Sequence, residues 1–166
     1  IGAVNVIKFI RDNNDLRLIG YNSDAIGFER SLLPHLKAHH NKALILGTGG
    51  ASKAVFYILK KLGIEATFVS RKKQDAKLSY DMLDEKVMKD CKLIINSSPV
   101  GTFPHVDECP QIPYSLLSDQ HFLYDLVYNP EETLFLKKGR ENGAQGINGM
   151  EMLIGQAKAA WEIWNK

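Results

Sequence analysis

The segment LILGTGGASKAV, residues 44–55, places a short apolar run directly before a glycine-rich turn and an alanine-containing stretch. An apolar strand that ends in such a turn and continues into a helix is the usual start of a βαβ unit that binds a phosphate-bearing ligand. In this pattern Gly47 allows a tight exit from the strand, and Gly49 lets a ligand approach the backbone closely. The unpaired amide groups at the start of the helix then point toward the position of a diphosphate.

The turn is therefore assigned to a dinucleotide cofactor through Gly47, Thr48, Gly49, Gly50 and Ala51. The turn precedes a second apolar strand at the spacing of a βαβ unit, as the dinucleotide fingerprint requires. The sequence lacks the Gly-Lys-Ser/Thr ending of a nucleoside triphosphatase loop. The alternative is a glycine loop that only changes the direction of the chain.

Outward from this turn, short apolar segments alternate with helical ones. Strands are predicted at residues 43–46, 66–70, 92–96, 122–126 and 144–146, and helices at residues 51–62, 131–142 and 149–164, with a short one at 84–89. This alternation predicts an α/β fold with a Rossmann-like, doubly wound and mainly parallel sheet that carries helices on both faces.

The first part of the sequence has a different pattern. Residues 4–10 and 16–22 are β-rich and are separated by polar residues, which favours a hairpin. Ser23 or Asp24 is then expected to cap a helix that runs toward His39, with Pro34 kinking or interrupting it. In the last helix, Ile154, Ala157, Trp161 and Trp164 form an apolar stripe that we interpret as a packing face.

Composition limits the possible partners. The 166 residues are 45% hydrophobic and carry a net charge of +2. So small a net charge argues against a protein that binds nucleic acid mainly through its phosphates. No apolar run approaches the roughly 20 residues that span a bilayer, so we do not expect a membrane as a partner. Nucleic acid is not expected as a partner either, and we expect the protein to be cytoplasmic. Cys91 and Cys109 have no metal-ligand spacing, so we expect them to be reduced and no metal to bind. Ile1 stands where a methionine would begin a chain, and we interpret the sequence as part of a longer protein.

The end of the second predicted strand distinguishes between the two nicotinamide dinucleotides. An NAD site usually has an acidic residue there, about 20 residues after the glycines, to accept hydrogen bonds from the ribose. This sequence has VSRKK at residues 69–73, so Arg71 and Lys72 would pair with the 2′-phosphate of NADP, and Ser70 is assigned to the same corner. The alternative is that these cations form a solvated helix start, although cations are unfavourable at a helix N-terminus.

The order of seven motifs resembles the shikimate dehydrogenase family over nearly the full chain. The motifs are IGAVNVI at residues 1–7, GYNSDAIGF at 20–28, GTGGASKAV at 47–55, VSRK at 69–72, NSSPVGT at 96–102, YDLVYNP at 124–130 and NGMEMLIGQA at 148–157. The resemblance implies reduction of 3-dehydroshikimate to shikimate with NADPH, in the route through chorismate to aromatic amino acids. It also implies a substrate domain ahead of the cofactor domain.

The resemblance also suggests roles for individual residues. Asp24 matches the catalytic aspartate that assists a lysine at the reacting oxygen. The positions that reach the substrate in the family are matched by Asn5, Asp24, Tyr128 and Gln156. Leu126 and Gly149 match positions at the nicotinamide end, and Ser97 follows a predicted strand in a cofactor-binding loop. Taken alone, Asp24 could simply cap a helix, and the others could be ordinary strand, aromatic and helix positions.

The family's lysine and its Ser-x-Ser motif lie upstream of the segment with which this sequence begins. Lys8 and Lys53 do not stand in the context of that lysine, so neither is assigned a catalytic role. We therefore expect the isolated chain to be inactive. Two alternatives stay open, namely an NADP-binding module without chemistry of its own and a quinate/shikimate dehydrogenase that uses NAD.

The expected organisation has three parts. Residues 1–22 are a remnant of the substrate domain, residues 23–147 form the NADP-binding domain, and residues 148–166 form a helix that packs back toward the substrate domain. The expected partners are the small-molecule substrate, the upstream domain and, through exposed apolar surface, a second copy in a homodimer.

Overall fold

The structure, a computed structural model, describes residues 1–12, 15–71 and 78–166. A six-stranded parallel sheet forms the body of the molecule, with strand order β5-β4-β3-β6-β7-β8. Its strands are β3 (Lys42–Leu46), β4 (Glu65–Ser70), β5 (Leu78–Ser79), β6 (Leu93–Asn96), β7 (Phe122–Asp125) and β8 (Gln145–Ile147). The chain enters the sheet at β3, in the middle, and adds β4 and β5 on one side of it. It then returns to the middle and adds β6, β7 and β8 on the other side. The point where the strand order reverses therefore lies between β3 and β6, where open α/β sheets bind ligands.

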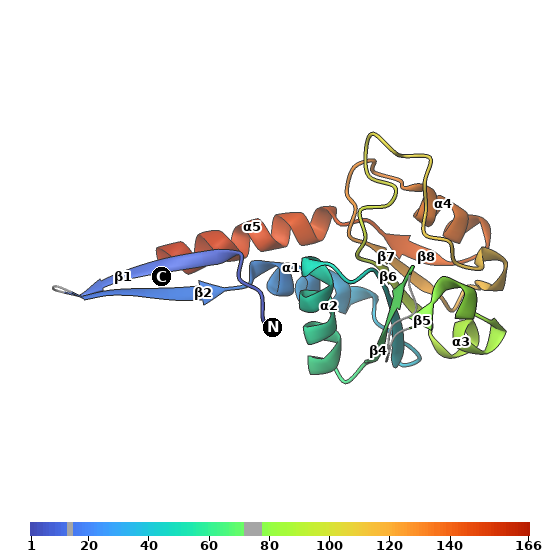
Figure 1. The fold of residues 1–166 in the computed structure, drawn as a ribbon, viewed down its shortest axis with the longest axis horizontal. Helices are drawn as coiled ribbons and strands as arrows, with labels where there is room; N and C mark the ends of the chain where they lie inside the picture. Colours follow the sequence, from blue (N-terminus) through green and yellow to red (C-terminus); the bar gives the residue numbers. More distant parts are fainter. Residues whose placement is uncertain (13–14, 72–77) are drawn as a thin grey trace.

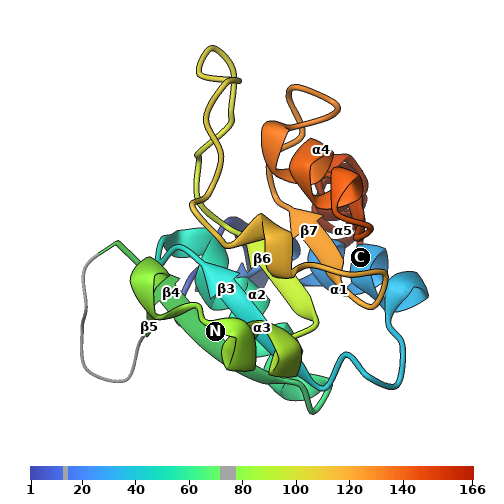
Figure 2. The same ribbon diagram turned by 90° about the vertical axis from the view of Figure 1, so that its right-hand side faces the viewer.

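Helices cover both faces of this sheet (Figures 1 and 2). One core joins the sheet to α1 (Ser23–Leu32), α2 (Gly50–Lys61) and α5 (Met150–Asn165). A second core on the opposite face includes Met88 of α3 (Glu85–Asp90) and Phe135 of α4 (Leu134–Glu141). Every residue of β6 and β7 is buried, as expected for strands covered on both sides. The predicted Rossmann-like fold class is confirmed.

A hairpin projects from this body, and α5 runs alongside it (Figure 1). Strand β1 (Val6–Asp12) pairs antiparallel with β2 (Asp15–Tyr21), so the predicted hairpin is confirmed with shifted boundaries. The indole nitrogen of Trp164 donates a hydrogen bond to the carbonyl of Ile7 over 3.2 Å. This contact joins the end of the last helix to the first strand.

The start of α1 corrects the predicted cap. Asn22, rather than Ser23 or Asp24, is the N-cap, and its side chain accepts a hydrogen bond from the amide of Ala25. The helix ends at Leu32, and the 3₁₀ turn Leu33–His35 follows, so the interruption predicted at Pro34 is confirmed. Strand β5, which pairs with β4 at only two positions, has no counterpart in the sequence prediction.

The apolar stripe of α5 is exposed in this structure. Trp161 is 67% exposed, Trp164 56% and Ile154 47%, so no described residue of this chain covers the predicted packing face. The hairpin beside them exposes further apolar side chains, with Phe9 at 63% and Leu18 at 59%. Among the described residues, no helix has both the length and the apolar character needed to cross a membrane.

Candidate dinucleotide site

The glycine turn begins directly where β3 ends, at the switch point of the sheet. Gly47 has a φ of +109°, and its amide donates a hydrogen bond to the carbonyl of Val69 in β4 over 2.9 Å. A Cβ at this position would lie 3.2 Å from both the Ser97 hydroxyl oxygen and the Ser98 nitrogen. The backbone angle and the close approach of the loop after β6 both favour glycine, which explains the tight exit predicted from the sequence.

The next two glycines face open space. Gly49 is the N-cap of α2 and provides no side-chain hydrogen bond to the helix. A Cβ added at Gly49 or Gly50 would meet no atom within 4 Å. The first amides of α2 therefore adjoin free room, and the helix dipole favours a negative group there by about 0.3–1 kcal/mol. This arrangement suits a diphosphate that approaches the backbone.

Two other loops complete the wall around this room. A cavity of about 350 Å³ lies among the start of α2, the loop after β6 and the loop after β7. Ser97, Leu126 and Tyr128 line it, as do Gly49, Gly50 and Ala51. The hydroxyl of Ser97 donates to the carbonyl of Leu46 over 2.9 Å, which fixes this loop against the end of β3. Six of the predicted cofactor or substrate residues thus surround one cavity.

Gly49→Ala should separate binding from folding. Because a Cβ at this position meets nothing in the chain and φ is −74°, we expect the free energy of unfolding to change by less than about 0.5 kcal/mol. The same methyl group would occupy the room assigned to the diphosphate, and NADP affinity should fall by about tenfold. Urea unfolding and isothermal titration calorimetry measure the two effects. Unchanged NADP affinity would remove the diphosphate from this turn.

The corner assigned to the 2′-phosphate lies at the end of β4. Ser70 is the last residue of that strand, and Arg71 follows it with an exposed side chain. Burial raises the pKa of the nearby Tyr80 hydroxyl, while the positive charge of Arg71 acts in the opposite direction. Lys72, the third residue assigned to this corner, lies outside the described residues. Arg71, which the structure does describe, therefore places a positive charge one strand away from the glycine turn.

Three residues assigned to the substrate lie close together at the start of α1. The amide of Ser23 donates to the side-chain oxygen of Asn5 over 2.8 Å, and its hydroxyl lies 3.2 Å from the amide oxygen of Gln156. Asp24 follows Ser23 and forms a side-chain hydrogen bond with Asn5. Burial raises the pKa of Asp24, and the hydrogen bond with Asn5 partly opposes this shift. The buried Ser23 hydroxyl, which the sequence prediction did not assign, thus links these three segments.

The crossing of α1 and α5 explains why Gln156 reaches this cluster. A Cβ on Gly27 would lie 2.5 Å from the carbonyl oxygen of Met152 and 2.8 Å from the nitrogen of Gln156. Gly155 approaches Gly27 from the other helix, and a Cβ on Gly155 would lie 3.1 Å from the Gly27 Cα. The two backbones are therefore nearly in contact, which places Gln156 beside the first turn of α1.

Gly149 occupies a crowded position at the N-cap of α5. It is buried, and a Cβ there would lie 2.1 Å from the carbonyl oxygen of Leu126. The Gly149 amide also donates to the carbonyl of Val127 over 3.1 Å. The structure places Gly149 behind Leu126, so it supports the cavity wall through the loop after β7.

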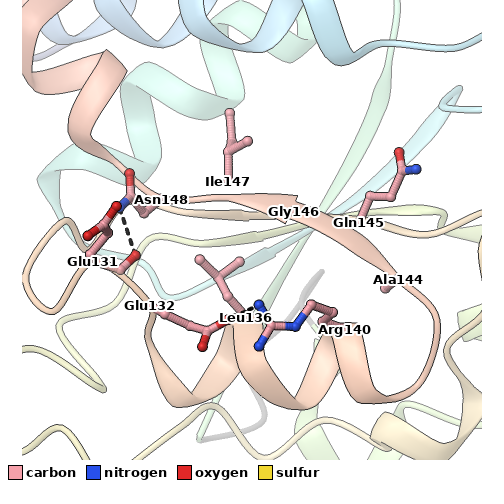
Figure 3. Close-up of a pocket in the computed structure, with 9 residues that line it drawn as sticks. All are labelled: Glu131, Glu132, Leu136, Arg140, Ala144, Gln145, Gly146, Ile147 and Asn148. Carbon is pink, nitrogen blue, oxygen red and sulfur yellow. Dashed lines mark hydrogen bonds and ion pairs between the residues drawn. The ribbon is translucent and has the colours of Figure 1, made fainter.

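A separate cavity of about 680 Å³ lies at the sheet edge between α4 and β8 (Figure 3). Some of its polar lining residues already bind one another. Glu132 forms an ion pair with Arg140, and the Asn148 side chain donates to the carbonyl of Glu131 over 2.8 Å. None of its lining residues was assigned to a ligand from the sequence. Within the described ranges, no cluster of three or more His, Cys, Asp or Glu side chains could hold a metal.

The strand order and the open glycine turn at the switch point define a dinucleotide-binding domain of the Rossmann-like class. No protein-family model matches the sequence. The chain is 33% identical, over an alignment 184 positions long, to the shikimate dehydrogenase (NADP(+)) of Desulforamulus reducens, and the alignment covers 99% of this chain and 62% of that protein. The resemblance to the shikimate dehydrogenase family is thus confirmed along this chain.

Solved structures agree with this assignment. A chorismate mutase/shikimate 5-dehydrogenase fusion protein from Clostridium acetobutylicum superposes with a TM-score of 0.82 at 36% identity, over 99% of this chain and 60% of that one. A shikimate dehydrogenase in complex with NADP+ superposes with a TM-score of 0.77 at 31% identity, over 98% of this chain and 61% of that one. This chain therefore spans about three-fifths of the proteins that it matches.

Proposed function

We propose that this chain forms the NADP-binding part of a shikimate dehydrogenase, together with a portion of its substrate site. The observation that carries the proposal is the uncapped start of α2, which faces open space at the switch point of the sheet. The location of Arg71 after β4 supports NADP rather than NAD, because a guanidinium pairs with a phosphate through charge-assisted hydrogen bonds. The relative from Desulforamulus reducens is named shikimate dehydrogenase (NADP(+)), and another shikimate dehydrogenase named above was crystallised with NADP+.

The residues present fit this cofactor in three places. The turn at residues 47–51 would hold the diphosphate, and Ser70 and Arg71 with Lys72 would hold the 2′-phosphate. Ser97 and Leu126 would border the nicotinamide end, with Gly149 supporting Leu126 from behind. When bound, NADPH supplies the hydride that reduces a carbonyl carbon. Excluding water from the cavity would be the task of the apolar side chains of Leu126 and Val127.

The substrate side is proposed on the cluster around Ser23. Asn5 and Gln156 offer amide groups to the hydroxyls of 3-dehydroshikimate, and Tyr128 approaches from the loop after β7. Asp24 would bind a hydroxyl of the substrate and orient the group that gives a proton to the carbonyl oxygen as it is reduced. In the family that group is a lysine in the substrate domain, and we propose that a segment beyond these 166 residues supplies it.

The domain organisation predicted from the sequence belongs to the same proposal. Residues 1–22 would complete the sheet of a substrate domain, residues 23–147 would hold NADP, and residues 148–166 would pack back on the substrate domain. The exposed apolar side chains on the hairpin and α5 support this, since they include Phe9, Leu18, Trp161 and Trp164. The role in aromatic amino-acid synthesis and the cytoplasmic location are also proposed. A homodimer is proposed for the chain without the upstream domain, since its exposed apolar surface could then pair with a second copy.

A turnover assay on the 166-residue chain tests the proposal. We expect NADPH to bind, while oxidation of shikimate with NADP stays at background until a substrate domain from a relative is added in trans. Turnover is followed by absorbance at the nicotinamide band, with quinate and NAD as parallel reactants. Failure to bind NADPH would contradict the proposal, and preferential turnover of quinate with NAD would favour the alternative quinate/shikimate dehydrogenase. Binding without turnover under every condition would favour a module without chemistry of its own.

A further inference from the structure

A buried carboxylate lies directly behind the cavity. Asp125, the last residue of β7, is fully buried, and so are Asn96 at the end of β6 and Thr133 at the N-cap of α4. None of the ion pairs formed by the described residues includes Asp125. A buried carboxylate without a cation is costly unless hydrogen bonds compensate for lost hydration.

Three donors converge on this side chain. Its Oδ1 accepts from the Asn96 amide over 2.9 Å and from the Val127 backbone nitrogen over 3.0 Å. Its Oδ2 accepts from the Thr133 hydroxyl over 2.6 Å. Burial raises the pKa of Asp125 to about 6, while all three hydrogen bonds act in the opposite direction. At pH 7.5 the group is therefore mostly ionised, and an ionised carboxylate has acceptor sites for all three donors.

Two of the three donors lead to a wall of the cavity, whereas Thr133 caps α4. The side-chain oxygen of Asn96 accepts from the Ser98 amide over 3.1 Å and from the Ser98 hydroxyl over 2.6 Å, which shapes the loop after β6. The bond to Val127 fixes the loop after β7, and the Val127 carbonyl in turn accepts from the Gly149 amide over 3.1 Å. Ser98 and Val127 both line the cavity opposite the glycine turn.

The sheet order indicates which half of the dinucleotide this network would serve. Arg71 follows β4 on one side of β3, whereas Asn96 and Asp125 end β6 and β7 on the other side. A ligand whose diphosphate lies at the start of α2 and whose 2′-phosphate lies at Arg71 would extend its nicotinamide over β6 and β7. The network is thus remote from the adenosine end and adjacent to the nicotinamide end.

We propose that Asp125 is a positioning residue, which holds the loops after β6 and β7 at the separation that the nicotinamide half of the cofactor requires. This inference rests on the proposed function. It assigns to Asp125 no contact with substrate or cofactor, because its side chain acts through Asn96 and Val127. Loss of its charge should therefore affect ligands that reach the loops after β6 and β7, and spare ligands that end at the diphosphate.

The test compares NADP with adenosine 2′,5′-bisphosphate, which has the adenosine end and lacks the nicotinamide half. In Asp125→Asn the amide has only one acceptor oxygen for the three donors, and we expect NADP affinity to fall by at least about fivefold. Affinity for the bisphosphate should stay within about twofold of the unaltered chain. Isothermal titration calorimetry at pH 7.5 gives both values.

Tyr124→Phe is the matched control. Tyr124 precedes Asp125 and lies on the opposite face of β7, and the change removes its buried hydrogen bond of 2.6 Å with the Ser31 hydroxyl. It should leave the ratio of the two affinities unchanged. Should Asp125→Asn fail to fold, Thr133→Val removes one donor, keeps the carboxylate, and should change the ratio in the same direction. Equal weakening of both ligands, or no change in the ratio, would overturn the positioning role. An unaltered chain that binds neither ligand would overturn the proposed function itself.

Discussion

Arg71→Ala should lower the affinity for NADP by about 10- to 100-fold and leave the affinity for NAD nearly unchanged. The two cofactors differ only in the 2′-phosphate, and a charge-assisted hydrogen bond to such a group contributes about 1.5–3 kcal/mol. Arg71 is exposed directly after β4, one strand from the glycine turn, where its guanidinium is available to a ligand. Isothermal titration with each cofactor, at one fixed salt concentration, gives the two changes.

Arg17→Ala serves as the control for Arg71. Arg17 is an exposed arginine of β2 in the hairpin, and its removal changes the net charge by the same amount. It should leave both affinities unaltered. If Arg71→Ala weakened NADP and NAD equally, the effect would be general electrostatic attraction, and the preference for NADP would need another source.

Gly149→Ala should lower the free energy of unfolding by about 1–3 kcal/mol, the usual cost of overpacking. Its Cβ would lie 2.1 Å from the carbonyl oxygen and 2.7 Å from the carbonyl carbon of Leu126. Both are backbone atoms, so no side-chain rotation relieves the overlap, and either α5 or the loop after β7 must shift. Because Leu126 lines the cavity, NADP affinity should fall as well. Urea unfolding followed by circular dichroism measures the stability change.

Gly49→Ala is again the suitable comparison, since an added Cβ meets no atom within 4 Å there. The pair should differ in kind, with Gly149→Ala losing stability and Gly49→Ala losing affinity alone. A Gly149→Ala chain as stable as the unaltered one would show that α5 and the loop after β7 pack less closely than these distances require.

Much of the fold could be predicted because the chain follows simple physical rules in its central part. The apolar strands and the glycine turn specify the parallel sheet, and Pro34 marks the end of α1. Strand β5 could not be predicted because it has only two residues, too few to show the alternation of apolar and polar residues that marks a strand. The cap of α1 was misassigned because Asn22, Ser23 and Asp24 are all good capping residues. The choice among them depends on where the chain leaves β2, and there the side-chain nitrogen of Asn22 also donates to the carbonyl of Ala3 over 3.1 Å.

The candidate site divides in the same way. The glycine turn and Arg71 follow from residue chemistry, whereas Asn5 and Gln156 were assigned only through the family resemblance. The structure brings the latter two together at Ser23, whose buried hydroxyl a sequence pattern does not reveal. Asp125 received no role from the motif that contains it, since an acidic residue at a strand end is usually solvated. The stripe of α5 shows the converse limit, because a periodic pattern identifies an apolar face without identifying what covers it.

Crystals of this chain soaked with NADP give the most direct test of where the diphosphate and the 2′-phosphate bind. We expect the diphosphate to lie against the backbone amides at the start of α2, with the 2′-phosphate about 3 Å from the guanidinium of Arg71. The nicotinamide should then extend toward Leu126. A 2′-phosphate bound away from the Ser70 and Arg71 corner, or a diphosphate remote from Gly49 and Gly50, would contradict the claim.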